Sequence, residues 1–251
     1  MSTAHGPALV LGAGGWLGAA LLAQVLAAGH AQVGALVQRP LASTHRGLLT
    51  LSQAELQAPD ERLRGTWSGA TAYLVLERPG LTGTRDAAFV APSVAQLPEL
   101  GRQLRALGVA RLFVVLPHAP NSLPVALRDG FADQDEQALS QLGFTQLVLL
   151  RSSRERVAVQ GSWLERFAAA WWSQLRWMLP DSERPLRSVA LARVAVAAER
   201  VLREAGPGTW VLSQELASRA AHAPQGVEAA LRTELLAKLM QNKERGSGRS
   251  G

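Results

Sequence analysis

The sequence predicts an α/β protein built on a doubly wound, mostly parallel sheet with helices on both faces. Apolar runs of strand length alternate with helical patterns over roughly the first 150 residues, which is typical of this fold class. The first apolar run leads directly into a glycine-rich turn and then an apolar helix. With 251 residues and 47% hydrophobic content, the chain can form one such domain with a sizeable core.

The N-terminal elements predict a strand–helix–strand unit with short connections. Residues 8–11 form the first expected strand, residues 15–28 the first helix and residues 32–37 the second strand. Gly29 stands just after the helix, where a left-handed cap residue is common. Because a helical crossover joins the two strands, we expect them to be parallel and the crossover to be right-handed.

The pattern is less regular over residues 38–69, where we expect a short third strand at 48–51 and a helix at 54–64 that Pro59 interrupts. Regular alternation then returns. The further expected strands are 71–76, 111–116 and 146–150, and the further expected helices are 94–107 and 123–142.

The alternation stops after Arg151. Large apolar residues recur at three- and four-residue spacing over 163–179, which predicts a helix with a wide apolar face. Its tryptophans either pack the helix onto the sheet or a second subunit, or line an apolar substrate pocket. The later expected elements are a helix at 189–204, a strand at 209–212 and a helix at 214–221.

These elements predict one main domain over residues 1–222, with the substrate-side elements mainly in 151–222. The late helices are expected to form a small cap on that side. Residues 223–242 should form a C-terminal amphipathic helix, and the glycine, serine and charge of residues 243–251 predict a disordered tail.

Composition narrows the classes of function. The absence of cysteine excludes disulfides and thiolate metal sites and fits a reducing cytoplasm, and the five histidines lack metal-ligand spacing, so no metal is expected. Residues 1–7 do not resemble a signal peptide, and no apolar run is long enough to span a membrane. The net charge of +6 comes largely from scattered arginine without interleaved aromatics, so nucleic acid is not an expected partner. We expect a cytoplasmic monomer or homodimer.

The glycine-rich turn is the candidate binding motif. Three glycines lie three residues apart between the first expected strand and helix, with a fourth beside them. Small residues let the strand reverse into the helix and let a phosphate approach the helix N-terminus. The alternative is a tight turn that only shapes the fold. The candidate residues for binding the pyrophosphate of a dinucleotide are Gly12, Gly14, Gly15, Trp16, Leu17 and Gly18.

The end of the second expected strand bears on the choice of cofactor. An acidic residue there would accept hydrogen bonds from a ribose 2′-hydroxyl, whereas an arginine would pair with a 2′-phosphate. The chain has Gln38, Arg39 and Pro40 at this point and no acid nearby. Arg39 therefore favours NADP over NAD, and the alternative is an ordinary solvated arginine at a strand end.

Leu11 to Gly18, together with Ala28-Gly29-His30 and Gly34 to Pro40, resembles the atypical and extended short-chain dehydrogenase/reductases. The length and layout are most similar to the small subfamily of oxidoreductases related to a Tat-interacting protein. The resemblance covers roughly residues 7–222 and implies a Rossmann-like NAD(P)-binding fold. It also implies a hydride-transfer site with a Tyr-x-x-x-Lys pair, in which tyrosine is the general acid/base and lysine lowers the pKa of the tyrosine.

The chain departs from that catalytic pattern. Its only tyrosine, Tyr73, lies in an expected buried strand, and the family pair falls on Pro124 and Arg128. Two other groups remain near the expected strand ends: His118, a candidate acid/base, and Ser122, a candidate to orient a carbonyl. Arg128 is a candidate to contact a ribose or an acidic substrate. Each has a plain alternative, namely a loop histidine, a helix cap and a solvated helix arginine.

Three hypotheses for function follow, and in the last of them the chain is a sheet protein that no longer binds a nucleotide. In the first, the chain is an NADP-dependent oxidoreductase that acts on an unknown carbonyl or alcohol substrate without the family tyrosine. In the second, it is a non-catalytic NADP(H)-binding regulator, assembly factor or redox sensor that works through an unknown small molecule or protein partner. The glycine turn supports dinucleotide binding under the first two, and the missing tyrosine favours the second.

Overall fold

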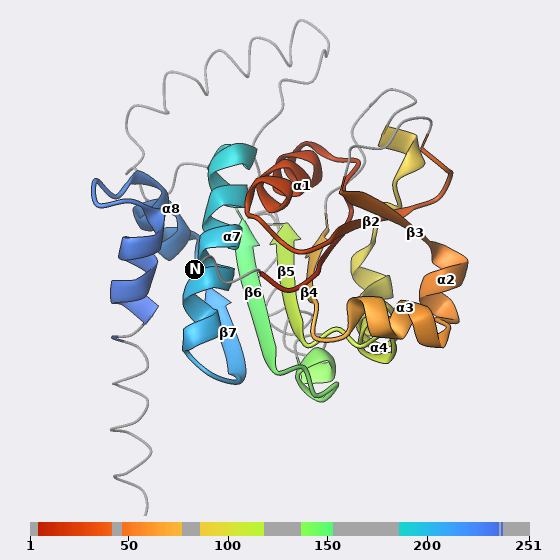
Figure 1. Cartoon of the computed structure of the whole chain (residues 1–251). Coiled ribbons are helices and arrows are strands. Elements are labelled where there is room, and N and C mark those ends of the chain that lie inside the picture. Colours follow the sequence, from red (N-terminus) through yellow and green to blue (C-terminus); the bar gives the residue numbers. More distant parts are fainter. Residues whose placement is uncertain are drawn as a thin grey trace, which may run out of the picture.

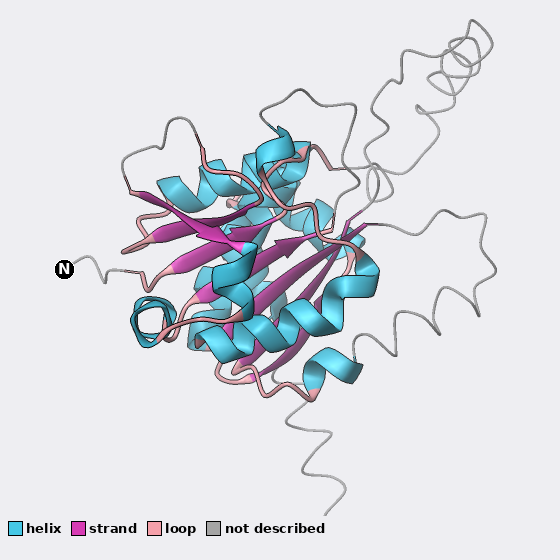
Figure 2. Ribbon diagram, turned by 90° about the vertical axis from the view of Figure 1, so that its right-hand side faces the viewer, coloured by secondary structure: helices cyan, strands magenta, loops and turns pink. Residues whose placement is uncertain are grey.

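A computed structural model of the chain describes residues 5–41, 47–76, 86–117, 137–152, 186–235 and 237. Within these ranges, seven strands form one sheet in the order β3-β2-β1-β4-β5-β6-β7, and every neighbouring pair is parallel. Helices cover both faces of this sheet (Figures 1 and 2). The predicted doubly wound, Rossmann-like α/β fold is therefore confirmed.

The strands and helices lie close to their predicted positions. The strands are β1 (Ala8–Leu11), β2 (Val33–Val37), β3 (Leu48–Ser52), β4 (Thr71–Val75), β5 (Arg111–Pro117), β6 (Gln146–Ser152) and β7 (Gly208–Leu212). The α-helices are α1 (Trp16–Ala27), α2 (Gln53–Gln57), α3 (Glu61–Trp67), α4 (Leu97–Leu107), α7 (Ser188–Glu204) and α8 (Gln214–His222). Short 3-10 turns, η1 (Asp86–Ala88) and η2 (Val94–Gln96), precede α4, and residues 227–235 are also helical.

Two apolar layers hold the sheet between its helices. One layer joins α1, α7 and α8 to one face, and the other joins α2, α3 and α4 to the opposite face. The second layer depends on a glycine in β2, because a Cβ on Gly34 would lie 2.7 Å from Cζ2 of the buried Trp67 side chain. The indole therefore fills the space that a side chain at position 34 would take.

A buried polar cluster joins α7 to the amino end of the sheet. Glu199 is fully buried, and its Oε1 accepts hydrogen bonds from the Thr71 hydroxyl at 3.1 Å and from Arg203 Nε at 2.8 Å. The Thr71 hydroxyl in turn accepts a bond from Arg111 Nε at 3.0 Å. Because Thr71 and Arg111 begin β4 and β5, this cluster fixes the C-terminal half of α7 at that edge.

No helix within the described ranges has both the length and the apolarity needed to cross a membrane. Nor does any group of three or more His, Cys, Asp or Glu side chains gather there in a way that could hold a metal ion.

Candidate active site at the carboxyl edge of the sheet

The sheet has a topological switch point between β1 and β4. The chain leaves β1 for β2 on one side and later returns to β4 on the other side of β1. The connections therefore run to opposite sides of this pair. In open α/β sheets, ligands bind beyond the carboxyl ends of two such strands, at the place here called the crevice. The predicted glycine turn lies at this edge, because it follows β1 directly.

At two positions of the turn, close backbone contacts leave room only for glycine. Gly12 has a left-handed backbone with φ of 84°, and a Cβ there would overlap the carbonyl oxygen of Val75 and lie 3.2 Å from Pro92 Cδ. A Cβ on Gly18 would overlap the carbonyl oxygen of Gly12. These are the roles of the first and third glycines in a dinucleotide-binding turn, namely the tight turn and the close packing of helix on strand.

Gly14 and Gly15 do not need a left-handed backbone, and both are partly exposed. Gly15 caps α1 in an extended conformation, with φ of −86° and ψ of 172°, which any residue adopts. The lack of a side chain at these two positions is therefore not explained by backbone conformation, and it leaves the main chain open on its exposed side. They fit the second role in a dinucleotide-binding turn, which is to let a pyrophosphate reach the main chain.

The N-terminus of α1 suits an anionic ligand. Its N-cap, Gly15, has no side chain with which to cap the helix, its first turn contains no acidic residue, and the first intrahelical bond runs from Ala19 N to Gly15 O at 2.8 Å. A helix N-terminus of this kind carries partial positive charge and amide donors. Trp16, the first helical residue, is 64% exposed and stands at the same edge.

The residues that follow β2 lie at the same carboxyl edge of the sheet. Gln38, Arg39 and Pro40 are exposed, and Arg39 forms no ion pair with any other described residue. Its guanidinium is therefore available to a phosphate, which it would bind through parallel donors.

A segment that the sequence did not single out borders both features. Residues 86–92, here called the strap, form an antiparallel bridge between Phe89 and Val37 at the end of β2. The amides of Gln38 and Arg39 donate to the Ala88 carbonyl at 2.7 and 3.3 Å. Farther along the strap, Pro92 is buried against Gly12. No motif or periodicity marks this segment, because its hydrogen bonds are made through the backbone to residues about 50 positions away.

The predicted catalytic residues His118, Ser122 and Arg128 lie outside the described residues, as do residues 153–185 of the substrate-side segment, which include the predicted helix over 163–179. Tyr73 is described and lies in the buried strand β4, as predicted. Its ring packs on Phe113 with centroids 5.3 Å apart, and burial raises the pKa of its hydroxyl well above the usual value of 10.0. Tyr73 is therefore a core residue and does not reach the crevice.

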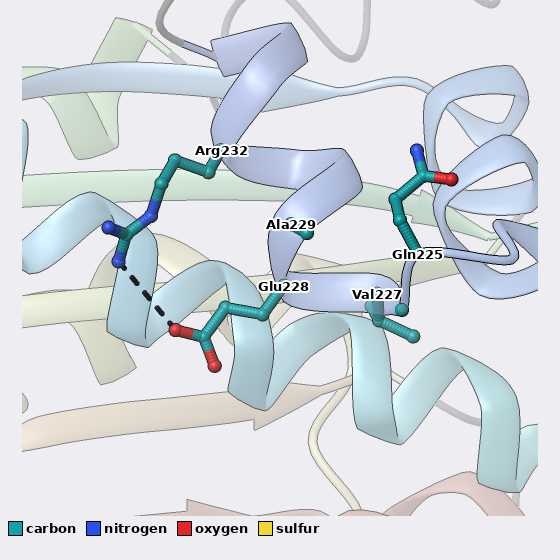
Figure 3. Close-up of a pocket in the computed structure, with 6 residues that line it drawn as sticks. Gln225, Val227, Glu228, Ala229 and Arg232 are labelled. Atoms are coloured by element: carbon teal, nitrogen blue, oxygen red, sulfur yellow. Dashed lines mark ion pairs between the residues drawn. The ribbon is translucent and has the colours of Figure 1, made fainter.

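An open depression of about 560 Å³ lies elsewhere, at the start of the helical residues 227–235 (Figure 3). Glu228 and Arg232 line it and pair with each other at 3.7 Å. Arg232 also pairs with Glu204 at the C-terminal end of α7, 3.1 Å away. Because α7 ends at the amino edge of the sheet, this depression is separate from the crevice beside β1.

Comparison with protein-family models and with curated protein sequences finds no match. Solved structures do resemble the chain. A short-chain dehydrogenase from Burkholderia cenocepacia in complex with NADP is 17% identical with a TM-score of 0.50, over 92% of this chain and 99% of that one. MoeE5 in complex with UDP-glucose and NAD is 16% identical with a TM-score of 0.49, over 82% and 75% of the two chains. A nucleoside-diphosphate-sugar epimerase from Staphylococcus aureus is 13% identical with a TM-score of 0.48, over 82% and 70%. At these identities, the likeness to the dehydrogenase shows a shared fold.

Proposed function

We propose that the chain binds a nicotinamide dinucleotide at the carboxyl edge of β1, with NADP(H) preferred over NAD(H), as an atypical short-chain dehydrogenase/reductase. The observation that carries the proposal is the turn of residues 12–18. It stands at the switch point of a parallel sheet, its glycines meet the spatial demands of a dinucleotide-binding turn, and it opens an uncapped helix. The dehydrogenase of the same fold was solved with NADP.

In this arrangement Gly14 and Gly15 would admit the pyrophosphate to the N-terminus of α1, and Arg39 would hold the 2′-phosphate of the ribose. The bound nicotinamide supplies hydride-transfer chemistry. This chain would bind and orient the dinucleotide through backbone donors and one guanidinium. For proton transfer to a substrate, His118, Ser122 and Arg128 remain our candidates.

A second candidate function is a non-catalytic NADP(H)-binding regulator or sensor. The specific observation in its favour is Tyr73, the only tyrosine of the chain, whose hydroxyl is buried in the core. The family position of the proton donor falls on Pro124, and proline has no proton to give.

Dinucleotide binding is tested by substitution at the cap of α1. Because Asp and Asn are both good helix caps, Gly15→Asp and Gly15→Asn should both fold, and the charge is their main difference. We expect fluorescence titration to show tight binding of NADPH by the wild type, weaker binding by Gly15→Asn and the weakest by Gly15→Asp, because the carboxylate repels the pyrophosphate. Equal affinity of the wild type and Gly15→Asp for NADPH would contradict the proposal.

Catalysis is tested separately with a panel of carbonyl substrates and NADPH oxidation as the readout. Turnover that disappears in His118→Ala or Arg128→Ala, while NADPH still binds, identifies the chain as an oxidoreductase. NADPH binding without turnover of any substrate favours the sensor.

A further inference from the structure

The strap, residues 86–92, pairs with the end of β2 on the side that faces β1. In a parallel ladder, alternate residues of a strand bond to the same neighbour. The bond from Ala8 N to Gln32 O, at 2.8 Å, shows that Gln32 faces β1, so Leu36 and Gln38 face that side as well. β1 ends at Leu11, so it does not extend alongside the residues that follow β2, and the strap lies beside the end of β2 instead.

Hydrogen bonds hold the strap there. Val90 N donates to the Leu36 carbonyl at 3.2 Å, and Gln38 N donates to the Ala88 carbonyl at 2.7 Å, which together form an antiparallel pair. Arg39 N donates to the same Ala88 carbonyl at 3.3 Å. Both backbone donors that follow β2 are therefore used by the protein itself.

Side-chain packing secures the strap at two further points. Phe89 is partly buried and packs on the apolar layer beneath α1, and Pro92 is buried against Gly12. Ser93 follows, and its amide donates to Gln96 Oε1 at 3.0 Å in a capping box that starts η2 and leads into α4. The strap thus joins the end of β2, the glycine turn and a helix start into one unit.

We propose that the strap positions Arg39 for cofactor discrimination. By using the amides of Gln38 and Arg39, it leaves the Arg39 guanidinium, among the described residues after β2, to select a 2′-phosphate. By fixing the backbone of these residues, it also fixes the point from which that side chain extends. The inference rests on the proposed function, because it concerns the same dinucleotide site.

Phe89→Ala tests the inference, since it removes the side chain that anchors the strap to the core. We expect NADPH to bind roughly tenfold more weakly, the loss of about one hydrogen bond to a charged group, with the affinity for NADH unchanged. The amides of Gln38 and Arg39 should lose protection from hydrogen exchange at the same time. Val94→Ala, at a 47% exposed apolar residue just beyond the strap, is the matched control and should leave both affinities unchanged.

A double variant tests whether the strap affects NADPH affinity through Arg39. Once Arg39→Ala has removed the guanidinium, adding Phe89→Ala should lower the NADPH affinity no further. Ala88→Gly, which loosens the strap without removing a core side chain, is the second variant if Phe89→Ala fails to fold, and the same loss of NADPH preference is expected.

Three outcomes separate the possibilities. Selective loss of NADPH affinity that vanishes in the Arg39→Ala background supports the inference. Equal losses for NADPH and NADH, or no loss for either, overturn it while the proposed function stands. Failure of the wild type to bind either dinucleotide overturns the proposed function and the inference with it.

Discussion

Replacing Glu199 with alanine should destabilise the protein through the buried cluster that ties α7 to the sheet. The carboxylate is fully buried, and one of its oxygens accepts bonds from the Thr71 hydroxyl and from two nitrogens of Arg203, whose side chain is 25% exposed. The substitution removes the negative charge and leaves both donors unpaired beneath α7.

The size of the effect follows from that burial. Breaking a buried ion pair by removing one partner costs about 3–5 kcal/mol, because the remaining charge stays poorly solvated. Glu199→Gln keeps the shape and an acceptor oxygen, so its cost should be that of weakened charged hydrogen bonds, about 1.5–3 kcal/mol. For a domain of this size, 1 kcal/mol lowers the melting temperature by about 2–4 °C, so Glu199→Ala should melt roughly 10 °C lower or more.

Urea unfolding and calorimetry measure this effect. The matched control is Glu204→Gln, one turn farther along α7, where the carboxylate is 65% exposed and pairs with Arg232 at 3.1 Å. An exposed pair contributes about 0–1 kcal/mol, so the control should stay close to the wild type. If Glu199→Ala costs less than about 1 kcal/mol, or no more than Glu204→Gln, the cluster does not hold α7 as argued.

Three further predictions follow from particular contacts. Gly18→Ala should prevent α1 from packing on the turn and should abolish NADPH binding, which NADPH titration measures. Gly65→Ala in α3, where a Cβ meets nothing within 4 Å, should instead raise the free energy of unfolding by about 0.5–1 kcal/mol, which circular dichroism melts measure. Ser52→Ala should cost about 1 kcal/mol in urea unfolding, because it removes the capping box with Glu55 that opens α2. Burial lowers the pKa of His30 below its usual 6.5, so the unfolded chain takes up a proton before the folded one. Stability should therefore fall as the pH drops below about 6.5, and His30→Gln should flatten that part of the pH profile of unfolding.

Local patterns were sufficient to predict most strands and helices. The runs that became β1, β4 and β5 are apolar along their length because both faces of a parallel sheet are covered, and this makes them visible in sequence. Gly29 was expected to follow the first helix and has a positive φ of 78°, and Gly108, directly after the helix expected at 94–107, has a positive φ of 101°. Each such signal depends on neighbours within a few residues.

Contacts between distant residues could not be predicted in this way. Thr71 and Glu199 are 128 positions apart, and neither residue type indicates that it will be buried with the other. The position of the strap could not be predicted from the sequence either, because it depends on where β1 ends and on backbone hydrogen bonds that any residue type can make. The site could be predicted only in part, because Gly12 to Gly18 form a local motif whereas the roles of His118, Ser122 and Arg128 depend on tertiary placement.

The polar groups differ between the two edges of the sheet, so we expect stability and the proposed dinucleotide binding to respond to different substitutions. At the amino edge, buried polar groups bond within the protein: besides the Glu199 cluster, Gln146 donates to the carbonyls of Leu202 and Gly206 and so ties down the end of α7. At the carboxyl edge, a glycine is the N-cap of α1 and the Arg39 side chain is exposed, an arrangement that suits an anionic ligand. Because these groups contribute little to folding, Arg39→Ala should change the ratio of NADPH to NADH affinity at unchanged stability. Glu199→Gln should lower stability at unchanged dinucleotide affinity, and a variant set that moved both quantities together would show that the edges are coupled through the sheet.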